Sequence, residues 1–273
     1  MPFVDIPGGS LHYDRTGAGG DAAARPLVLL LPQSSGPLGT APFMERLAER
    51  HVVITYDQRG TGASSPAPPT LSMASQAADV LGLLDTLGLQ RAALVCHSTG
   101  CGIGLSVAAD HSDRVSALVL AAPWTFADAH LATMQKLRVA AARGLDAKQY
   151  AHFNAALLFP PDYRREQQAG FDQIAKQAVS APQDADKIEQ RLNAILAFDA
   201  RPFLPSIRSK TLVLSACDDQ LMPIWFAKEA ADAIPDAELV ALDGGGHMIL
   251  ESRAAEASDT ILRFLEQFIP DHI

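Results

Sequence analysis

The chain has 273 residues, of which 48% are hydrophobic and 19% charged, and its formal net charge at pH 7 is −9. This length can bury a large core, as one α/β domain with an insertion or as two small domains. Nucleic-acid binding needs clustered Lys and Arg, so the negative net charge argues against a nucleic-acid partner.

The N-terminal residues and the cysteines indicate the cellular compartment in which the protein is expected. Residues 1–7 lack the basic and apolar segments of a secretory leader. The apolar run at 27–31 is far shorter than the about 20 residues that span a bilayer. The three cysteines follow no disulfide-framework spacing, which is typical of free thiols in a reducing compartment. We therefore expect a cytoplasmic protein without a membrane partner.

The first half of the chain alternates predicted strands and helices. Residues 3–6 and 11–15 alternate apolar with polar residues around a Pro-Gly-Gly turn, which predicts a hairpin with one wet face. Apolar runs typical of strands buried in a parallel sheet lie at 26–31, 52–56, 92–95 and 115–121. Helical spacing lies between them at 41–50, 72–89 and 100–109. This order predicts a doubly wound, mostly parallel α/β sheet with right-handed crossovers.

The alternation stops at residue 123. Residues 124–207 show no convincing strand and are typical of several helices broken by prolines, after which strands at 211–215 and 238–242 resume the pattern. We predict a core of residues 1–122 and 208–273, with residues 123–207 inserted as a helical cap. Such a cap would lie over the carboxyl edge of the sheet, where ligands bind in this architecture.

A serine-centred turn follows the strand at 92–95. The segment Cys96-His-Ser-Thr-Gly100 joins this strand to a helix, and a serine on such a turn holds its hydroxyl above the sheet. The turn tolerates only small neighbours two residues on either side of the serine, usually glycines. Cys96 departs from that pattern but is small. Ser98 is therefore the candidate nucleophile, and a helix N-cap is its alternative role.

A serine hydroxyl needs a base within hydrogen-bond reach, and the base needs an orienting acid. Asp218 and Asp219 directly follow the strand at 211–215, and His247 follows the strand at 238–242 on a run of three glycines. The chain order Ser98, Asp, His247 is the order used with this turn. On its own, His247 would more often be a surface loop histidine.

These residues resemble the α/β-hydrolase family over essentially the whole chain. The segments Tyr56-Asp-Gln-Arg-Gly-Thr-Gly62, Arg191-Leu-Asn-Ala194 and Ala216-Cys-Asp-Asp-Gln-Leu-Met-Pro223 are most similar to RutD-type hydrolases of pyrimidine-ring degradation. Those are proposed to hydrolyse small aminoacrylate or carbamate substrates. In that family the acid lies four residues before the proline, so the resemblance favours Asp219 over Asp218.

The resemblance also implies an oxyanion hole. It would use the backbone N–H of Thr99 and one from the loop after the third strand, which usually begins His-Gly. This chain has Pro32-Gln33 there, so the alignment makes Ser34 the second donor, and a one-residue shift would make it Ser35. A backbone donor requires no particular side chain, so the hole can survive the replacement.

Other polar residues have structural interpretations. We expect His97 to point away from the triad, as pocket wall or packing. Cys96 and Cys101 match no standard zinc spacing and are expected to be core thiols. Asp57 and Arg59 are expected to tie neighbouring turns together.

The predicted cap supplies the candidate substrate-binding residues. An arginine that points into the pocket would select a substrate carboxylate, because its planar fork matches that group. Arg191 together with Asn193 is our candidate for this role, and Trp124 is a further candidate for substrate contact.

The sequence therefore predicts a serine hydrolase that acts through an acyl-enzyme on a small ester, amide or carbamate-type carboxylic substrate. No metal or organic cofactor is required. The alternatives are hydrolysis of a carbon–carbon bond or an enol-lactone by the same triad, and a non-catalytic small-molecule receptor. The expected partner is a small-molecule substrate, and a homodimer is left open.

Overall fold

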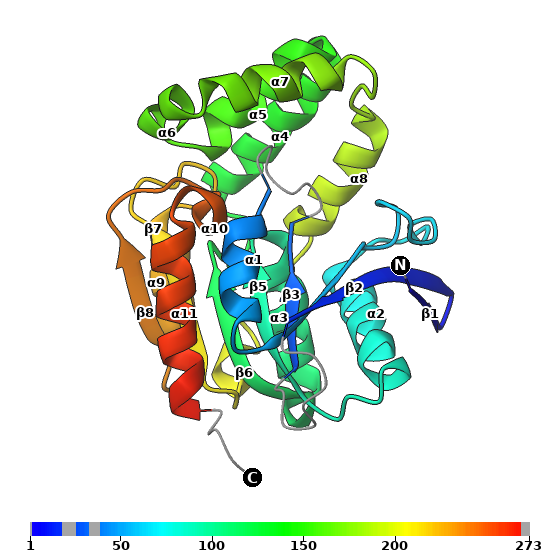
Figure 1. Ribbon diagram of the computed structural model, residues 1–273, viewed down its shortest axis with the longest axis vertical. Coiled ribbons are helices and arrows are strands. Elements are labelled where there is room, and N and C mark those ends of the chain that lie inside the picture. Colours follow the sequence, from blue (N-terminus) through cyan, green and yellow to red (C-terminus); the bar gives the residue numbers. More distant parts are fainter. Residues whose placement is uncertain (1, 18–25, 33–38, 269–273) are drawn as a thin grey trace.

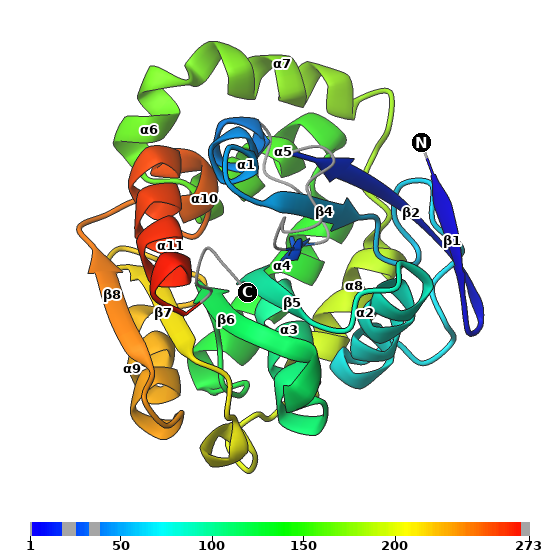
Figure 2. The same ribbon diagram turned by 60° about the horizontal axis from the view of Figure 1, so that its bottom comes forward.

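The computed structural model describes residues 2–17, 26–32 and 39–268. Within these residues the strands form one sheet in the order β1-β2-β4-β3-β5-β6-β7-β8 (Figure 2). The strands are β1 (Phe3–Ile6), β2 (Gly9–Thr16), β3 (Pro26–Leu30), β4 (Val52–Tyr56), β5 (Ala92–His97), β6 (Val115–Ala121), β7 (Thr211–Ala216) and β8 (Glu238–Leu242). The β1–β2 and β2–β4 pairs are antiparallel, and all the others are parallel. The predicted mostly parallel α/β sheet is confirmed.

Helices cover both faces of the sheet (Figure 1). They are α1 (Ala41–Ala48), α2 (Met73–Thr86), α3 (Thr99–Asp110), α9 (Ile224–Ala233), α10 (Ile249–Ser252) and α11 (Ala254–Phe268). Apolar residues of the central strands alternate between two core clusters: Val28 and Leu94 face the cluster that contains α2, α3 and α9 residues, whereas Leu27 and Ala93 face the cluster with α1 and α11 residues. Continuous apolar runs are required because both faces of each strand are buried.

Five helices connect β6 to β7 and lie over the end of the sheet toward which its parallel strands run (Figure 1). They are α4 (Ala129–Gly144), α5 (Ala147–Leu158), α6 (Pro161–Glu166), α7 (Gln168–Ala178) and α8 (Ala185–Leu196). Leu158 and Leu192 from these helices belong to the same apolar cluster as the sheet strands. These helices therefore form a roof over the carboxyl edge, packed continuously onto the core.

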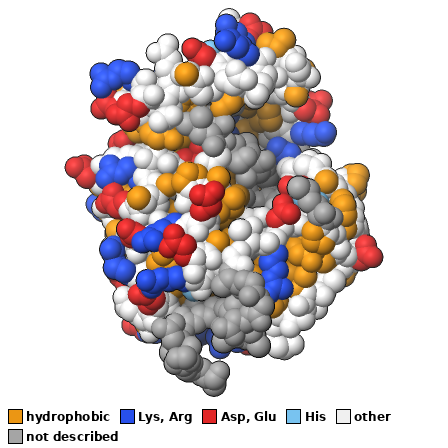
Figure 3. Space-filling view, viewed as in Figure 1, with side chains coloured by type: hydrophobic (Ala, Val, Ile, Leu, Met, Phe, Trp, Pro, Cys, Tyr) orange, Lys and Arg blue, Asp and Glu red, His pale blue; other side chains and the backbone are white. Residues whose placement is uncertain are grey.

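Charged side chains of both signs are interspersed on the face shown in Figure 3. Among the described residues, none of the helices has the length and apolar character needed to cross a membrane.

Candidate active site

Ser98 lies at the junction of β5 and α3 in a left-handed backbone conformation, with φ 52° and ψ −118°. Its N–H donates to the Ala121 carbonyl at 2.9 Å, which holds the turn against β6. A Cβ on Gly100 would lie 1.9 Å from the Leu30 carbonyl oxygen, so only glycine fits there. The sheet therefore fixes the strained turn that raises the serine above its carboxyl edge.

Cys96, the departure from the usual glycine, is accommodated by a second glycine. Its side chain is fully buried, and a Cβ added to Gly104 of α3 would lie 2.3 Å from its Sγ. The Cys96 thiol therefore occupies the space that a side chain at position 104 would fill. Cys101 is also buried, with its Sγ 3.2 Å from the Ala121 carbonyl. Both thiols lie in the core.

Ser98, His247 and Asp219 form a hydrogen-bonded chain. The Ser98 Oγ lies 2.7 Å from His247 Nε2, and His247 Nδ1 lies 2.8 Å from Asp219 Oδ2. All three residues are buried. They come together because β5, β7 and β8 are parallel, so the loops that follow them meet at one edge. The imidazole can accept a proton at Nε2 while its Nδ1–H donates to the carboxylate.

The two adjacent carboxylates do different things. The second oxygen of Asp219, Oδ1, accepts from the N–H groups of Leu221 at 2.8 Å and Met222 at 2.9 Å. Asp218 instead accepts from the Gly246 N–H at 2.8 Å. Asp219 is therefore the residue that orients the imidazole, and Asp218 holds the loop that carries it.

His97 is buried and packs in the core, as expected, but it contacts His247, which corrects our expectation that it points away from the triad. The His97 Nε2–H donates to the His247 carbonyl at 2.9 Å, and the two ring centroids are 5.7 Å apart. Burial and the neighbouring His247 lower the pKa of His97 to about 4. The ring is therefore neutral near pH 7, which suits one donor bond to a carbonyl.

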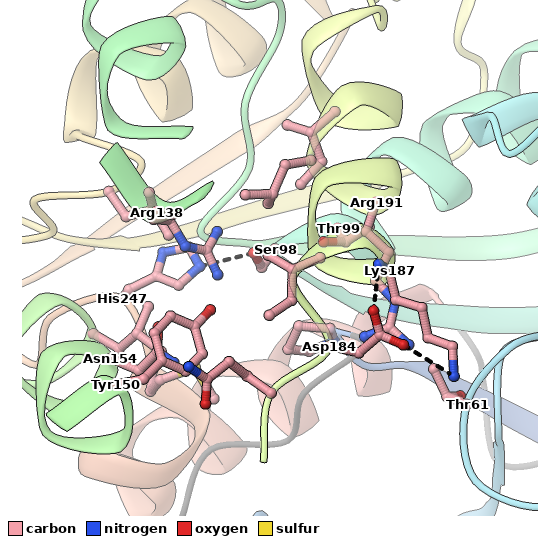
Figure 4. A pocket seen from close by; sticks show the side chains of 18 of the residues that line it. Thr61, Ser98, Thr99, Arg138, Tyr150, Asn154, Asp184, Lys187, Arg191 and His247 are labelled. Atoms are coloured by element: carbon pink, nitrogen blue, oxygen red, sulfur yellow. Dashed lines mark hydrogen bonds and ion pairs between the residues drawn. The ribbon is translucent and has the colours of Figure 1, made fainter. Parts of the chain in front are cut away.

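A cavity of about 440 Å³ opens above Ser98. Ser98, Thr99 and His247 line it from the core, and residues of α4, α5 and α8 line it from the roof (Figure 4). Lys187 and Asp184, both exposed, pair at 3.6 Å on the α8 side. A hydroxyl and an imidazole that are hydrogen-bonded to each other therefore face a space large enough for a small molecule.

A family model described as the alpha/beta hydrolase fold matches residues 26–254. The chain belongs to the α/β-hydrolase family.

Individual relatives of this α/β hydrolase span nearly its whole length. It is 32% identical to RutD of Caulobacter vibrioides, named as a proposed carbamate hydrolase, over 94% of this chain and 95% of that one. It is 35% identical to the RutD protein of Variovorax paradoxus, which carries the same name, over 93% and 96%. The crystal structure of the enol-lactonase from Burkholderia xenovorans superposes with a TM-score of 0.85 at 28% identity, over 97% and 99%. The predicted resemblance to RutD-type proteins is confirmed.

The structure corrects two of the three substrate-binding residues predicted for this α/β hydrolase. Arg191 does line the cavity, and its Nη2 donates to the Gly60 carbonyl at 3.2 Å. Asn193 is exposed and does not line it, because two residues further along a helix the side chain points away. Trp124 is fully buried against Phe198, with ring centroids 5.4 Å apart, and is part of the core.

The predicted oxyanion donors are only partly placed. Thr99 is buried, lines the cavity and is the first residue of α3, so its N–H has no acceptor within the helix. Ser34 and Ser35 lie outside the described residues. The strand end before them is held by Gln58, whose Nε2 donates to the Leu31 carbonyl at 2.8 Å.

The sequence analysis missed Arg138, Tyr150 and Asn154, which line the cavity from α4 and α5. A signal for Arg138 was present. It follows Leu131 and Gln135 and precedes Ala142 at helical spacing, and those three residues are buried. A charged residue on the inward face of a cap helix indicates that the helix lines a polar cavity. This signal from Arg138 was additional to the one from Arg191 of α8.

Proposed function

We propose that this α/β hydrolase is a serine hydrolase that cleaves a small ester, amide or carbamate-type carboxylic substrate through an acyl-enzyme. The observation that carries the proposal is the chain of hydrogen bonds from Asp219 through His247 to Ser98 on the floor of the cavity. Each of these substrates presents a carbonyl carbon bonded to an oxygen or nitrogen leaving group. The names of the relatives, a proposed carbamate hydrolase and an enol-lactonase, support the same bond types.

The first half of the reaction forms the acyl-enzyme. The Ser98 oxygen attacks the carbonyl carbon while His247 Nε2 takes its proton, and Asp219 stabilises the imidazolium. The developing oxyanion is bound by the backbone N–H of Thr99 and, in this proposal, of Ser34. One such donor contributes a factor of about 10²–10³ in turnover. His247 then protonates the leaving group.

The second half releases the acid. Water loses a proton to His247 and attacks the acyl carbon, and the collapse of the tetrahedral intermediate returns the proton to Ser98. In this proposal residues 123–207 are the cap that encloses the substrate over a core of residues 1–122 and 208–273.

Enol-lactone or carbon–carbon bond hydrolysis is the second candidate. The similarity to the Burkholderia xenovorans enol-lactonase favours it, and an enol-lactone is itself an ester that would open by the same acylation. Mass analysis of the products from a panel of simple esters, carbamates and enol-lactones distinguishes these substrates.

Labelling with a fluorophosphonate probe tests the mechanism. We expect the folded protein to be labelled at Ser98 and to show a burst of 4-nitrophenol from 4-nitrophenyl acetate. Ser98→Ala should abolish labelling and reduce turnover at least about 10³-fold. A folded protein that neither reacts with the probe nor cleaves the ester would instead support the receptor alternative.

A further inference from the structure

Arg138, one of the cations that line the cavity, has no ion pair with a carboxylate among the described residues. Lys187 pairs with Asp184, and Arg191 donates to the Gly60 carbonyl. Arg138 Nη1 donates to the neutral amide oxygen of Gln135 at 3.0 Å, and its buried Nε has no hydrogen-bond partner. Nη2 and the second hydrogen of Nη1 therefore remain for a ligand.

This arrangement is unfavourable in the absence of an anion. A guanidinium stays charged at any ordinary pH, although burial lowers the pKa of Arg138. Arg138 is half-buried and its Nε is fully buried without a hydrogen-bond partner, so part of the guanidinium has lost its hydration with no ion pair among the described residues to replace it. An apolar residue would serve a purely structural role better at this position, on the inward stripe of α4. The charge is thus explained by something that enters the cavity.

The surroundings fit an anion with oxygen acceptors. Among the described residues, three cations line the cavity, Arg138, Lys187 and Arg191, against one lining carboxylate, Asp184. Asn154 lines the same cavity from α5, and its side-chain NH₂ is a further hydrogen-bond donor. A carboxylate can accept from both groups.

The direction of Arg138 connects the anion to the chemistry. Figure 4 shows its guanidinium projecting into the cavity on the side of His247 and Ser98, whereas Lys187 and Asp184 pair elsewhere on the wall. A cavity of about 440 Å³ suits a short molecule that reaches from one group to the other.

We propose that Arg138 binds the carboxylate of the substrate while the scissile carbonyl lies at Ser98. The enzyme would thus select small anionic esters, amides or carbamates over neutral ones. This inference rests on the proposed serine-hydrolase function. The terminal edge of the guanidinium makes the paired bonds that a carboxylate accepts.

Monomethyl succinate and dimethyl succinate test the proposal. They share the same methyl ester and differ in the charge of the far end, and methanol release reports kcat/KM for both. In wild type the charged ester is expected to be preferred. In Arg138→Gln the ratio of charged to neutral kcat/KM should fall about 10–100-fold, the worth of a charged hydrogen bond.

Arg143→Gln is the matched control. Arg143 lies on the same helix, is exposed, and pairs with Asp186 and Glu189 outside the cavity. Its loss should leave the ratio as in wild type. A ratio that is equal in wild type and Arg138→Gln overturns the role of Arg138 while leaving the hydrolase proposal standing. A wild type that cleaves neither succinate ester nor 4-nitrophenyl acetate overturns the hydrolase proposal instead.

Succinate binding provides a readout that does not depend on turnover of the esters. As a competitive inhibitor of 4-nitrophenyl acetate hydrolysis, succinate should have a Ki about 10–100-fold higher in Arg138→Gln than in wild type or Arg143→Gln. Arg138→Met is a second variant that controls for a folding defect. Its melting temperature should be no lower than that of wild type, because an apolar side chain replaces a charge that lacks an ion pair. Equal Ki values in folded Arg138→Gln and wild type contradict the proposal.

Discussion

Asp218 and Asp219 are adjacent carboxylates that accept hydrogen bonds from different groups. Asp219 receives the imidazole N–H and two backbone N–H groups, so both of its oxygens are used. Asp218 accepts from the Gly246 N–H, whereas the imidazole of His247 is hydrogen-bonded to Asp219. Two adjacent residues therefore have different roles: Asp219 orients the imidazole of His247, and Asp218 holds the loop that carries it.

Asp219→Asn should reduce kcat about 10⁴-fold, because the amide favours the wrong imidazole tautomer and cannot balance the imidazolium. Asp218→Asn is the matched comparison and should reduce kcat less than about tenfold, because it changes one acceptor to a backbone N–H. Both values come from steady-state hydrolysis of the same ester. A larger loss in Asp218→Asn would reverse the assignment of the acid.

His97 makes the folding stability depend on pH. Its pKa is about 4 in the folded protein and 6.5 for an unperturbed histidine, so between these values the unfolded chain binds a proton that the native chain does not. Stability from this residue is therefore complete above about pH 6.5 and is lost as the pH falls toward 4.

His97→Gln should remove this dependence while keeping a donor for the His247 carbonyl. Between pH 7 and pH 4.5, wild type should lose about 2 kcal/mol more unfolding free energy than the variant. Urea denaturation at the two pH values measures the difference. Parallel losses in the two proteins would contradict it.

At the scale of elements, β5, the turn at Ser98 and α3 form one unit whose spacing is set by small residues. Gly100 lets α3 approach the Leu30 carbonyl, and Gly104 leaves room for the Cys96 thiol. The unusual cysteine and this glycine are a complementary pair across the strand–helix contact. Packing this close transmits any added volume to the nucleophile turn.

Gly104→Ala should lower the unfolding free energy by about 1–3 kcal/mol, because the new Cβ overlaps the Cys96 Sγ. In a Cys96→Ala background the same change should be milder, since the nearest remaining Cys96 atom is its Cβ at 3.5 Å. Chemical denaturation of the four proteins gives the coupling energy. Strictly additive effects would show that the two sites do not share this space.

At the scale of the whole molecule, the roof helices and the sheet share one apolar core. The Leu158 carbonyl at the end of α5 accepts from the N–H groups of both His247 and Met248, at 3.0 and 3.2 Å. Trp124, between β6 and α4, packs on Phe198 just beyond α8. The roof therefore holds the base in place besides enclosing the cavity.

We expect the roof and the core to unfold together. Far-ultraviolet circular dichroism, tryptophan fluorescence and loss of esterase activity should follow one urea transition, because loss of α5 or α8 exposes the shared core. A fluorescence and activity transition that precedes the loss of sheet structure would show that the roof unfolds separately.

The sheet class, the turn at Ser98 and the candidate positions Ser98 and His247 could be predicted from the sequence alone. Those depend on local periodicity, on turn chemistry and on the rule that parallel strands end at one edge, all of which are readable along the chain. The residues of the proposed triad could be located for that reason, although the choice between Asp218 and Asp219 needed the family resemblance.

Which residues of the roof helices face the cavity depends on how these helices pack. Arg191, Asn193 and Trp124 were all candidates in the sequence, with Arg191 and Asn193 preferred for a substrate carboxylate. The packing of α8 turns Asn193 outward, and the junction with β6 buries Trp124. Arg138 was found only in the structure, where the packing of α4 among the other roof helices leaves it without an ion pair to a carboxylate among the described residues. Direction and pairing depend on how elements pack, and no local pattern records that.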